Sequence, residues 1–462
     1  MKEITTDLLV VGGGPAGYTA AFRAADLGSK VILVEEHSKL GGVCLNVGCI
    51  PSKTLLHIAK VKEEVEHLNS LSIVNEKLSL NPKAAIKHKD SVINSLSLGL
   101  KALAKKRDVT VINGYGKFSS ENSLVVEDTI INFKKSIIAV GSKPIRLPFL
   151  PDDKRILDST TALELENPKA NLLVLGGGII GLEMTNIYEA FGAKITIAEL
   201  GSQLIAEADS DVIEVYTKRL TPKLKNLYLN TKVTKVVADK KLIVHFENSE
   251  KSWTEEFDNV MVAVGRMPNG DLINAEKAGV NVTDKGFIEV NKKMETNQKH
   301  IYAIGDVIGQ PMLAHKALHE AKIAAENQAG QDHYFEPKVI PSVAYTNPEI
   351  AWTGILEKEA KAKNIDYGVG MFPLAASGRA TSQGVNYGLA KLIFNKENNI
   401  IIGGTIFAPG AGDLISEVCL AIEMNCDAED IALTIHPHPT LSESIHGACE
   451  VYNKTVTDLL NT

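Results

Sequence analysis

Cysteine is scarce in this chain of 462 residues, which carries five. Secreted proteins that are held together by disulfides are short and dense in cysteine, so a long chain with few, scattered cysteines does not belong to that class. A reducing compartment fits better, and we expect the cytoplasm. In such a compartment, a close pair of cysteines favours a catalytic over a structural role. The five are Cys44, Cys49, Cys419, Cys426 and Cys449.

Other features are missing too. No apolar run approaches the roughly 20 residues that span a bilayer, and the N-terminus shows no charged-then-apolar leader. With 49 basic and 56 acidic residues the net charge is -7, and no dense Lys/Arg tract occurs. We therefore expect no membrane crossing, no nucleic-acid partner and small-molecule chemistry instead. The three C-terminal cysteines match no metal-binding spacing, so we expect structural thiols there and no metal site.

Two segments share one pattern, which is the nearest feature to an internal repeat. Each begins with a short apolar run of strand type, at 7–11 and 171–175, continues through Gly-x-Gly-x-x-Gly and enters a helical stretch. A second apolar run then ends in an acid, Glu35 or Glu199, which follows the last glycine by 18 residues in both segments. The glycines are Gly12, Gly14 and Gly17 in the first segment and Gly176, Gly178 and Gly181 in the second.

This pattern is typical of dinucleotide-binding units. The first glycine permits a tight turn, the second lets the backbone approach a pyrophosphate, the third lets the helix pack on the strand, and the helix N-terminus attracts the phosphates. Glu35 and Glu199 would then accept hydrogen bonds from ribose hydroxyls. Because Glu199 would repel a 2′-phosphate and Leu200 and Gly201 offer no arginine to receive one, we predict NAD rather than NADP.

Cys44 and Cys49 follow the first motif, with four residues between them. On an ideal helix such positions are roughly 8–9 Å apart, whereas a disulfide needs a Cα separation of roughly 4.4–6.8 Å. A bridge therefore requires bent backbone, which Gly48 and Pro51 allow. A helix that begins near Pro51 would also favour a thiolate. Two sulfurs beside a redox cofactor can pass two electrons, and two buried free cysteines are the alternative interpretation.

Weaker sequence patterns predict how the rest of the chain is divided into helices, strands and domains. Residues 62–110 have helical spacing and predict surface helices that are inserted into the first dinucleotide unit. Two buried strands end in Gly and then Pro, at 137–144 and 260–268, and they predict where the chain leaves one domain for another. From residue 338 the pattern changes to Val/Ile-rich strands, turns and one long helix, which predicts an α+β module without a nucleotide fingerprint.

Four longer motifs carry a resemblance to a known family. They are Cys44–Lys53, Ile301–Lys316, Ile340–Trp352 and His436–Glu443. With these motifs and the two glycine fingerprints, the chain resembles the flavoprotein disulfide reductases nearly end to end. Within that family it is similar to the members that oxidise dihydrolipoamide.

The resemblance implies an α/β fold with two Rossmann-like dinucleotide-binding domains, for FAD and NAD, and a C-terminal α+β dimerisation domain. It also implies an obligate homodimer that serves 2-oxoacid dehydrogenase complexes, whose lipoyl domains carry the dithiol substrate. The implied boundaries are 1–144 for the FAD-binding domain, 145–265 for the NAD-binding domain, 266–337 for a central segment that completes the FAD domain, and 338–462 for the dimerisation domain.

The resemblance also assigns the cofactor contacts. Lys53 and Glu183 would form an ion pair near the flavin ring, since a buried ammonium needs an anionic partner, and Asp306 would lie close to the ribityl chain. One departure is Val140, where many members have threonine. The FAD contacts are Gly12, Gly14, Gly17, Glu35, Lys53, Gly116, Asp306 and Ala314. The NAD contacts are Gly176, Gly178, Gly181, Glu199 and Gly265.

The implied mechanism uses a redox disulfide between Cys44 and Cys49. A substrate thiolate would attack Cys44, Cys49 would leave as a thiolate that stacks against the flavin, and the electrons would pass through FAD to NAD. A base must remove the substrate's thiol proton, because an ordinary thiol is mostly protonated at neutral pH.

The residues alone leave three histidines open as that base: His436, His438 and His446. The resemblance selects His438, whose imidazole Glu443 would hold in the required tautomer. It also implies that His438 acts on the disulfide of the partner subunit.

Three alternatives to this function remain. A glutathione reductase of the same fold would be expected to use NADP and to carry arginines where this chain has Leu200 and Gly201. A mercuric reductase would be expected to have a C-terminal cysteine pair, which this sequence lacks. A non-catalytic flavin-binding subunit would have little reason to keep the thiol pair, the base and both acids together.

Overall fold

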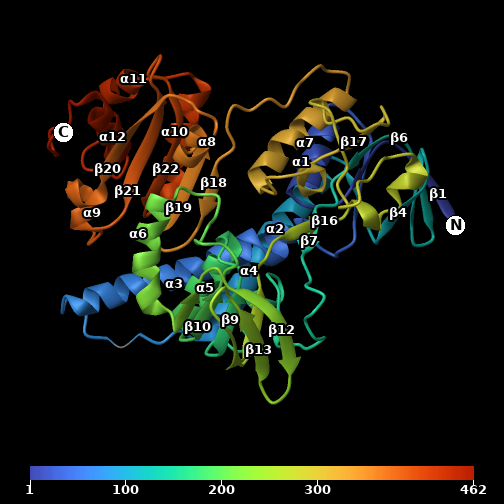
Figure 1. Ribbon diagram of the computed structural model, residues 1–462. Helices are drawn as coiled ribbons and strands as arrows, with labels where there is room; N and C mark the ends of the chain where they lie inside the picture. Colours follow the sequence, from blue (N-terminus) through green and yellow to red (C-terminus); the bar gives the residue numbers. More distant parts are fainter. Residues whose placement is uncertain (77, 462) are drawn as a thin grey trace.

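The computed structural model describes residues 1–76 and 78–461. Two largely parallel sheets and one five-stranded antiparallel sheet are the largest sheets of the described chain, and helices pack against them (Figure 1). We call the parts built on these sheets the first, second and C-terminal units, in the order of the chain. Among the described residues we find no helix with the length and hydropathy that a membrane span requires.

The apolar runs around the two glycine motifs form central strands. The first motif lies between β1 (Lys2–Val11) and β2 (Val31–Glu35), and the second lies between β9 (Asn171–Leu175) and β10 (Lys194–Ala198). All four predicted strands are therefore confirmed. Apart from Ile4, near the start of β1, their Val, Leu and Ile side chains are almost fully buried, as expected for strands in the middle of a parallel sheet.

The first sheet has the order β3-β2-β1-β6-β5-β4, and β17 pairs with β6 in parallel. The chain near residue 300 therefore returns to the sheet that the N-terminus began. Helices α1 (Pro15–Asp26) and α7 (Ala314–Gln328) pack against each other beside it (Figure 1). The remaining strands are β3 (Thr110–Asn113), β4 (Gly116–Ser120), β5 (Ser123–Val126), β6 (Thr129–Ile138) and β17 (Ile301–Ala303).

The second sheet is fully parallel, with the order β11-β10-β9-β15-β8. A separate antiparallel sheet, β12-β13-β14, packs its apolar side chains against it. The elements of this unit are β8 (Ile156–Leu157), α5 (Ile179–Phe191), α6 (Ser210–Leu220), β11 (Asn226–Tyr228), β12 (Lys232–Ala238), β13 (Leu242–Glu247), β14 (Ser252–Phe257) and β15 (Asn259–Val262).

Three helices fill the stretch between β2 and β3. They are α2 (Gly42–Val47), α3 (Cys49–Ser70) and α4 (Pro82–Lys106). The helices that the sequence predicts over 62–110 are therefore confirmed. Helix α3 contacts both α4 and α5, so it links the first unit to the second (Figure 1).

The two Gly-then-Pro stretches pair with each other. Gly141 and Gly265 have φ values of 64 and 124, in the left-handed region that favours glycine. The strands that follow them, β7 (Ser142–Pro144) and β16 (Arg266–Pro268), form a two-stranded antiparallel ribbon. The two connections between the first and second sheets therefore run side by side.

The C-terminal unit is an antiparallel sheet, β18-β19-β22-β21-β20, covered by helices, which confirms the predicted α+β module. The expectation of one long helix is wrong: α10 has 13 residues and α12 has 11, because Asn425, with φ 57, and two prolines interrupt the helical stretch. The elements are β18 (Ser342–Ala344), β19 (Glu349–Gly354), α8 (Glu357–Ala362), β20 (Tyr367–Pro373), α9 (Gly378–Ser382), β21 (Leu389–Asn395), β22 (Ile401–Ala408), α10 (Ala411–Glu423), α11 (Ala428–Leu433) and α12 (Glu443–Asn453).

Candidate active site

The cysteine pair lies where α2 meets α3. Cys44 belongs to the short α2, and Cys49 is the first residue of α3. Gly48 separates the two helices with φ -143 and ψ -110, so the backbone bends between the cysteines as the sequence predicts. Both cysteines are free thiols, and the structure therefore describes the dithiol form of the pair.

The two thiols differ in acidity. A hydrogen bond from Cys44 lowers the pKa of Cys49 to about 7, while desolvation opposes this change and the charge of Lys53 assists it. The same hydrogen bond, together with burial, raises the pKa of Cys44. Cys49 also begins α3, where the partial positive charge of a helix N-terminus favours an anion. Cys49 is therefore the sulfur that ionises first near neutral pH.

Lys53 and Glu183 form the ion pair that the family resemblance implies. The Lys53 Nζ donates to both carboxylate oxygens of Glu183 at 2.9 Å, and the Glu183 side chain is only 5% exposed. Sequence reasoning missed a third member, Tyr345. Its backbone N–H donates to Glu183 Oε1 at 3.1 Å, and its ring centroid lies 4.4 Å from the Lys53 Nζ. The only sequence signal for Tyr345 was its place inside the motif at 340–352.

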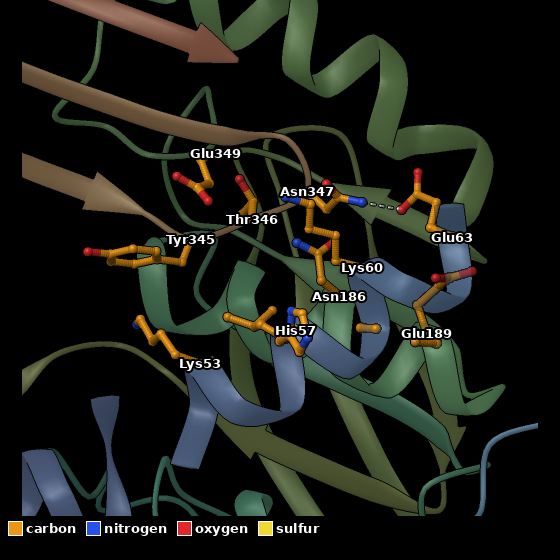
Figure 2. Close-up of a pocket in the computed structure, with 13 residues that line it drawn as sticks. Lys53, His57, Lys60, Glu63, Asn186, Glu189, Tyr345, Thr346, Asn347 and Glu349 are labelled. Atoms are coloured by element: carbon orange, nitrogen blue, oxygen red, sulfur yellow. Dashed lines mark hydrogen bonds between the residues drawn. The ribbon is translucent and has the colours of Figure 1, made fainter. Parts of the chain in front are cut away.

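A cavity of about 240 Å³ opens beside this ion pair. Its walls come from α3, α5 and the segment 345–349, with Lys53 and Tyr345 at one end and Glu63 at the other (Figure 2). Most of the residues that line the cavity are polar or charged, and it is large enough for several water molecules, so solvent can approach Lys53 from this side. The other polar residues that line it include His57, Lys60, Asn186, Glu189 and Glu349.

The first glycine motif forms a loop that only glycines can build. Gly12 has φ 105. A Cβ at Gly17 would lie 1.7 Å from the Gly12 carbonyl oxygen, and one at Gly12 would lie 2.3 Å from the Ala139 carbonyl oxygen. Helix α1 begins directly after Gly14, and no side chain caps its first N–H groups. These uncapped donors fit the pyrophosphate of a dinucleotide.

The second glycine motif repeats this construction. Gly176 has φ 100, and a Cβ at Gly181 would lie 2.2 Å from the Gly176 carbonyl oxygen. Helix α5 begins after Gly178 without a side-chain cap. A Cβ at Gly178 would meet no protein atom within 4 Å, so the space that a ligand's phosphates need is open there.

Each acid accepts a hydrogen bond from the backbone of its own glycine loop, and sequence reasoning missed this contact. Glu35 Oε2 accepts a hydrogen bond from the Gly13 N–H at 2.6 Å, and Glu199 Oε2 accepts one from the Gly177 N–H at 2.6 Å. Burial raises the pKa of Glu35, although backbone N–H donors oppose that rise. A carboxylate has about four acceptor sites, so both acids can also bind ribose hydroxyls.

Asp306 joins a polar cluster at the ribbon of β7 and β16. It lies in a single 3-10 turn, Gly305–Ile308, and its Oδ2 accepts from the Ser142 hydroxyl at 2.5 Å. The Arg266 Nε donates to the same Ser142 oxygen at 2.8 Å. Burial lowers the pKa of Arg266, although Asp306 and Cys49 oppose that change. Sequence reasoning missed Ser142 and Arg266, although each directly follows a glycine of the matched pair.

Three predicted cofactor contacts have less distinctive surroundings. Ala314 is the first residue of α7. Gly116 is buried in β4, where a Cβ would lie 2.7 Å from Leu124, so packing alone explains this glycine. Gly265 occupies the turn before β16. Their contacts with FAD or NAD stay predictions.

The three candidate histidines have different environments. The His436 side chain is 7% exposed, and both ring nitrogens are engaged, by a carboxylate at 2.7 Å and a carbonyl at 2.8 Å. The Nε2 of His446 lies 3.0 Å from a backbone carbonyl. His438 is 80% exposed, and its Nδ1 lies 2.8 Å from Glu443 Oε1. Its Nε2 has no hydrogen-bond partner within residues 1–76 and 78–461, which leaves it free for a proton transfer.

Glu443 is held firmly at the start of α12. Its Oε2 accepts from the Thr440 N–H at 2.8 Å. Burial alone would raise the pKa of Glu443, but the hydrogen bonds from Thr440 and His438 outweigh it and lower the pKa. In the described chain no hydrogen bond links His438 to either cysteine, and α12 and α2 lie in different parts of the molecule (Figure 1).

Two family models match the chain. Residues 6–321 match the pyridine nucleotide-disulphide oxidoreductases, and residues 340–449 match the dimerisation domain of the same group. The chain belongs to the pyridine nucleotide-disulphide oxidoreductase family. Membership of this family implies FAD and NAD(H) as cofactors, in agreement with the prediction.

Curated relatives of this family cover the whole chain. The proteins named dihydrolipoyl dehydrogenase from Vibrio parahaemolyticus and Haemophilus influenzae are 53% and 52% identical to it over 467 residues, which is 100% of this chain and 98% of each relative. A protein of the same name from Staphylococcus aureus is 42% identical over 97% of this chain and 96% of its own length.

Solved structures share the fold. The HOCl-induced flavoprotein disulfide reductase RclA from Escherichia coli, in a Cu(II) complex, has a TM-score of 0.87 at 25% identity and covers 97% of this chain and 99% of its own. LpdA from Mycobacterium tuberculosis has a TM-score of 0.87 at 24% identity, with the same coverage. The predicted fold class, two Rossmann-like parts and a C-terminal dimerisation domain, is confirmed.

Proposed function

We propose that this protein oxidises protein-bound dihydrolipoamide to lipoamide and reduces NAD+ to NADH, with FAD as its resident cofactor. The observation that carries the proposal is the thiol pair, in which Cys49 ionises near neutral pH at the start of a helix, one turn before Lys53. Support comes from full-length relatives at 53% and 52% identity that are named dihydrolipoyl dehydrogenase.

The first glycine loop and the polar groups that follow it would hold FAD. The loop would bind the pyrophosphate, Glu35 a ribose, Lys53 the flavin ring and Asp306 the ribityl chain. Once bound, FAD supplies chemistry that no side chain has, since it accepts an electron pair from a dithiol and passes it to NAD+ as hydride. The proposed contacts are Gly12, Gly14, Gly17, Glu35, Lys53, Gly116, Asp306 and Ala314.

The second glycine loop would hold NAD. The Glu199 carboxylate would accept from the ribose hydroxyls and would repel a 2′-phosphate, and neither Leu200 nor Gly201 could neutralise that phosphate. We therefore propose NAD rather than NADP. The proposed contacts are Gly176, Gly178, Gly181, Glu199 and Gly265, with Glu183 nearby as the partner of Lys53.

The chain's own part in the reaction is a thiol–disulfide exchange. In the oxidised pair, a substrate thiolate would attack the Cys44 sulfur, the bond between Cys44 and Cys49 would break, and Cys49 would leave as a thiolate. The second substrate thiol would then displace Cys44, which closes the substrate disulfide. The electron pair then resides in the Cys44–Cys49 dithiol. A low pKa makes Cys49 the better leaving group of the two.

His438 would act as the general base. Its free Nε2 can take the proton from the substrate thiol, while Glu443 holds Nδ1 and so selects the tautomer with an accepting Nε2. The base and the thiol pair would meet across a homodimer, in which each His438 serves the partner subunit's disulfide.

A homodimer is also favoured by the surface of the C-terminal unit, which the family model describes as a dimerisation domain. Large apolar side chains are exposed there, and a second copy of the chain would cover them. They include Leu420 at 63%, Met424 at 68%, Leu433 at 74% and Ile435 at 96% exposure.

We further propose the domain limits 1–144, 145–265, 266–337 and 338–462. The pairing of β17 with β6 supports the assignment of the third segment to the FAD-binding domain. Lipoyl domains of 2-oxoacid dehydrogenase complexes would deliver the substrate, and the cytoplasm would be the location.

Parallel assays test the proposed activity. NADH oxidation by the purified dimer is measured with lipoamide, with oxidised glutathione and with Hg²⁺. We expect turnover with lipoamide alone, and with NADH in preference to NADPH. Anaerobic titration with NADH should also produce a long-wavelength band from a thiolate beside the flavin. A flavin-free protein, or one that turns over glutathione faster than lipoamide, would contradict the proposal.

A further inference from the structure

The Lys53 ammonium has few restraints of its own. A lysine side chain is long and flexible, and that of Lys53 is 33% exposed, with the open cavity on one side. Glu183 accepts two of its hydrogen bonds. The Tyr345 ring covers a further side, with its centroid 4.4 Å from Nζ, within the distance of a cation–π contact (Figure 2).

Tyr345 itself is well anchored. It follows β18 in the C-terminal unit, and its backbone N–H is bonded to Glu183. Two residues later, the Asn347 side chain donates to Glu63 at 2.9 Å (Figure 2). Glu63 lies about 15 Å along α3 from Lys53. Hydrogen bonds therefore anchor the segment to α5 through Glu183 and to α3 through Glu63, and they hold the Tyr345 ring beside the ammonium.

The ring face, rather than the hydroxyl, makes the contact with Lys53. The Tyr345 hydroxyl has no hydrogen-bond partner in the part of the chain that the structure describes. Burial raises the pKa of this hydroxyl, so the ring is neutral at working pH.

We propose that Tyr345 is a positioning residue, whose ring face keeps the Lys53 ammonium beside Glu183 and Cys49. The inference rests on the proposed function, because it concerns the thiolate that this function requires. It makes the C-terminal unit part of the thiol site within the same chain.

The effect of Tyr345 would reach Cys49 through Lys53. The charged and titratable groups that face Cys49 are Cys44, Lys53, Glu183 and Arg266, and Lys53 stabilises the thiolate. If the ammonium moves away, the thiolate loses this support while Glu183 still opposes it. Cys49 should then ionise at a higher pH.

The test uses the holoenzyme with Cys44→Ser, in which Cys49 is the single thiol of the pair and the flavin stays oxidised. The long-wavelength band of a Cys49 thiolate beside the flavin is recorded against pH for three forms: Tyr345 retained, Tyr345→Phe and Tyr345→Leu. We expect the phenylalanine form to keep the midpoint, because it keeps the ring face. We expect the leucine form to raise it by about 0.5–1 pH unit.

Two outcomes would overturn the inference: a leucine form that titrates at the unchanged pH, or a phenylalanine form that shifts as far as the leucine form. If the leucine form loses its flavin, phenylalanines with increasing fluorination at position 345 preserve the shape and weaken the ring face. The midpoint should then rise with the number of fluorines, and a constant midpoint would contradict us. A missing band in all forms would overturn the proposed function, and this inference with it.

Discussion

At the scale of single residues, the neighbours of a side chain decide whether it can react. His436 and His438 are two positions apart, yet one is buried with both nitrogens engaged and the other is 80% exposed with a free Nε2. The two cysteines also differ through their neighbours, because Cys44 donates the hydrogen bond that lowers the pKa of Cys49. The residue type alone could not show which histidine has a free nitrogen or which cysteine ionises first.

Replacing His438 by glutamine should therefore remove the base while the rest of the site stays intact. We expect lipoamide turnover to fall by about 10²-fold or more, the usual contribution of a general base. NADH oxidation by ferricyanide, which needs no substrate thiolate, should change little. His446→Gln is the matched control and should keep near-normal lipoamide turnover. Comparable losses in both variants would argue against the assignment.

The acidity of Cys49 predicts a pH-dependent spectrum. The pKa of Cys49 is about 7, below the ordinary thiol value, so the thiolate is populated above that pH and is protonated below it. In the anaerobically reduced holoenzyme, the long-wavelength band should weaken as the pH falls through about 7, and Cys49→Ser should have no such band. Equal intensity at pH 5.5 and 8.5, or a band that survives in Cys49→Ser, would show that another group is responsible.

At the scale of elements, the strand–glycine loop–helix unit occurs twice with the same construction. In both units the third glycine of the motif packs against the carbonyl of the first. The acid at the C-terminal end of the second strand, Glu35 or Glu199, accepts at 2.6 Å from the N–H of the residue after the first glycine, Gly13 or Gly177. The acid therefore fixes the shape of the loop before any ligand binds. A ligand's phosphates and ribose meet a preformed surface.

Alanine at Gly17 should destroy this packing. Its Cβ would lie 1.7 Å from backbone, which cannot swing aside, so we expect a loss of about 1–3 kcal/mol in unfolding free energy and a protein that is purified without flavin. Gly99→Ala is the matched control: Gly99 is exposed in α4 with open space around it. That variant should keep its flavin and gain about 0.5–1 kcal/mol. Thermal unfolding and the absorbance of bound flavin measure both effects.

At the scale of the whole molecule, ion pairs of one buried lysine join the C-terminal unit to the second unit. Lys391 in β21 is 2% exposed and donates to Asp211 at 2.7 Å and to Glu357 at 2.6 Å, with Asp209 at 3.3 Å. Asp209 also accepts from backbone N–H groups at the start of α8. These contacts hold the stretch before α6, near the proposed NAD loop, against the unit that we expect to form the dimer.

Mixed dimers test whether the site is shared between subunits. Neither His438→Gln nor Cys44→Ser should turn over lipoamide alone, but a mixed dimer of the two would combine an intact thiol pair from one subunit with an intact histidine from the other. Co-expression in equal amounts should restore about one quarter of the wild-type sites. Mixed dimers that stay inactive would mean that the base and the thiols must come from the same chain.

Much of the fold could be read from the sequence because its signals are local. Apolar runs, the Gly-x-Gly-x-x-Gly spacing and helical periodicity each involve a few neighbouring residues, and they located the strands of both dinucleotide units and the helices over 62–110. The elements of the C-terminal unit were predicted less accurately. One long helix was expected there, because single prolines and an asparagine turn weigh little in a periodic pattern.

The sequence by itself determined the two glycine loops, their acids and the bend between the cysteines, since sterics and backbone geometry act over short stretches of chain. Only the tertiary structure decided which distant side chains meet. Tyr345 contacts Glu183 across 162 positions, and Arg266 contacts Ser142 across 124. The free nitrogen of His438 is likewise a property of its surroundings. Such contacts depend on how whole sheets and helices pack, and no local pattern of residues records that packing.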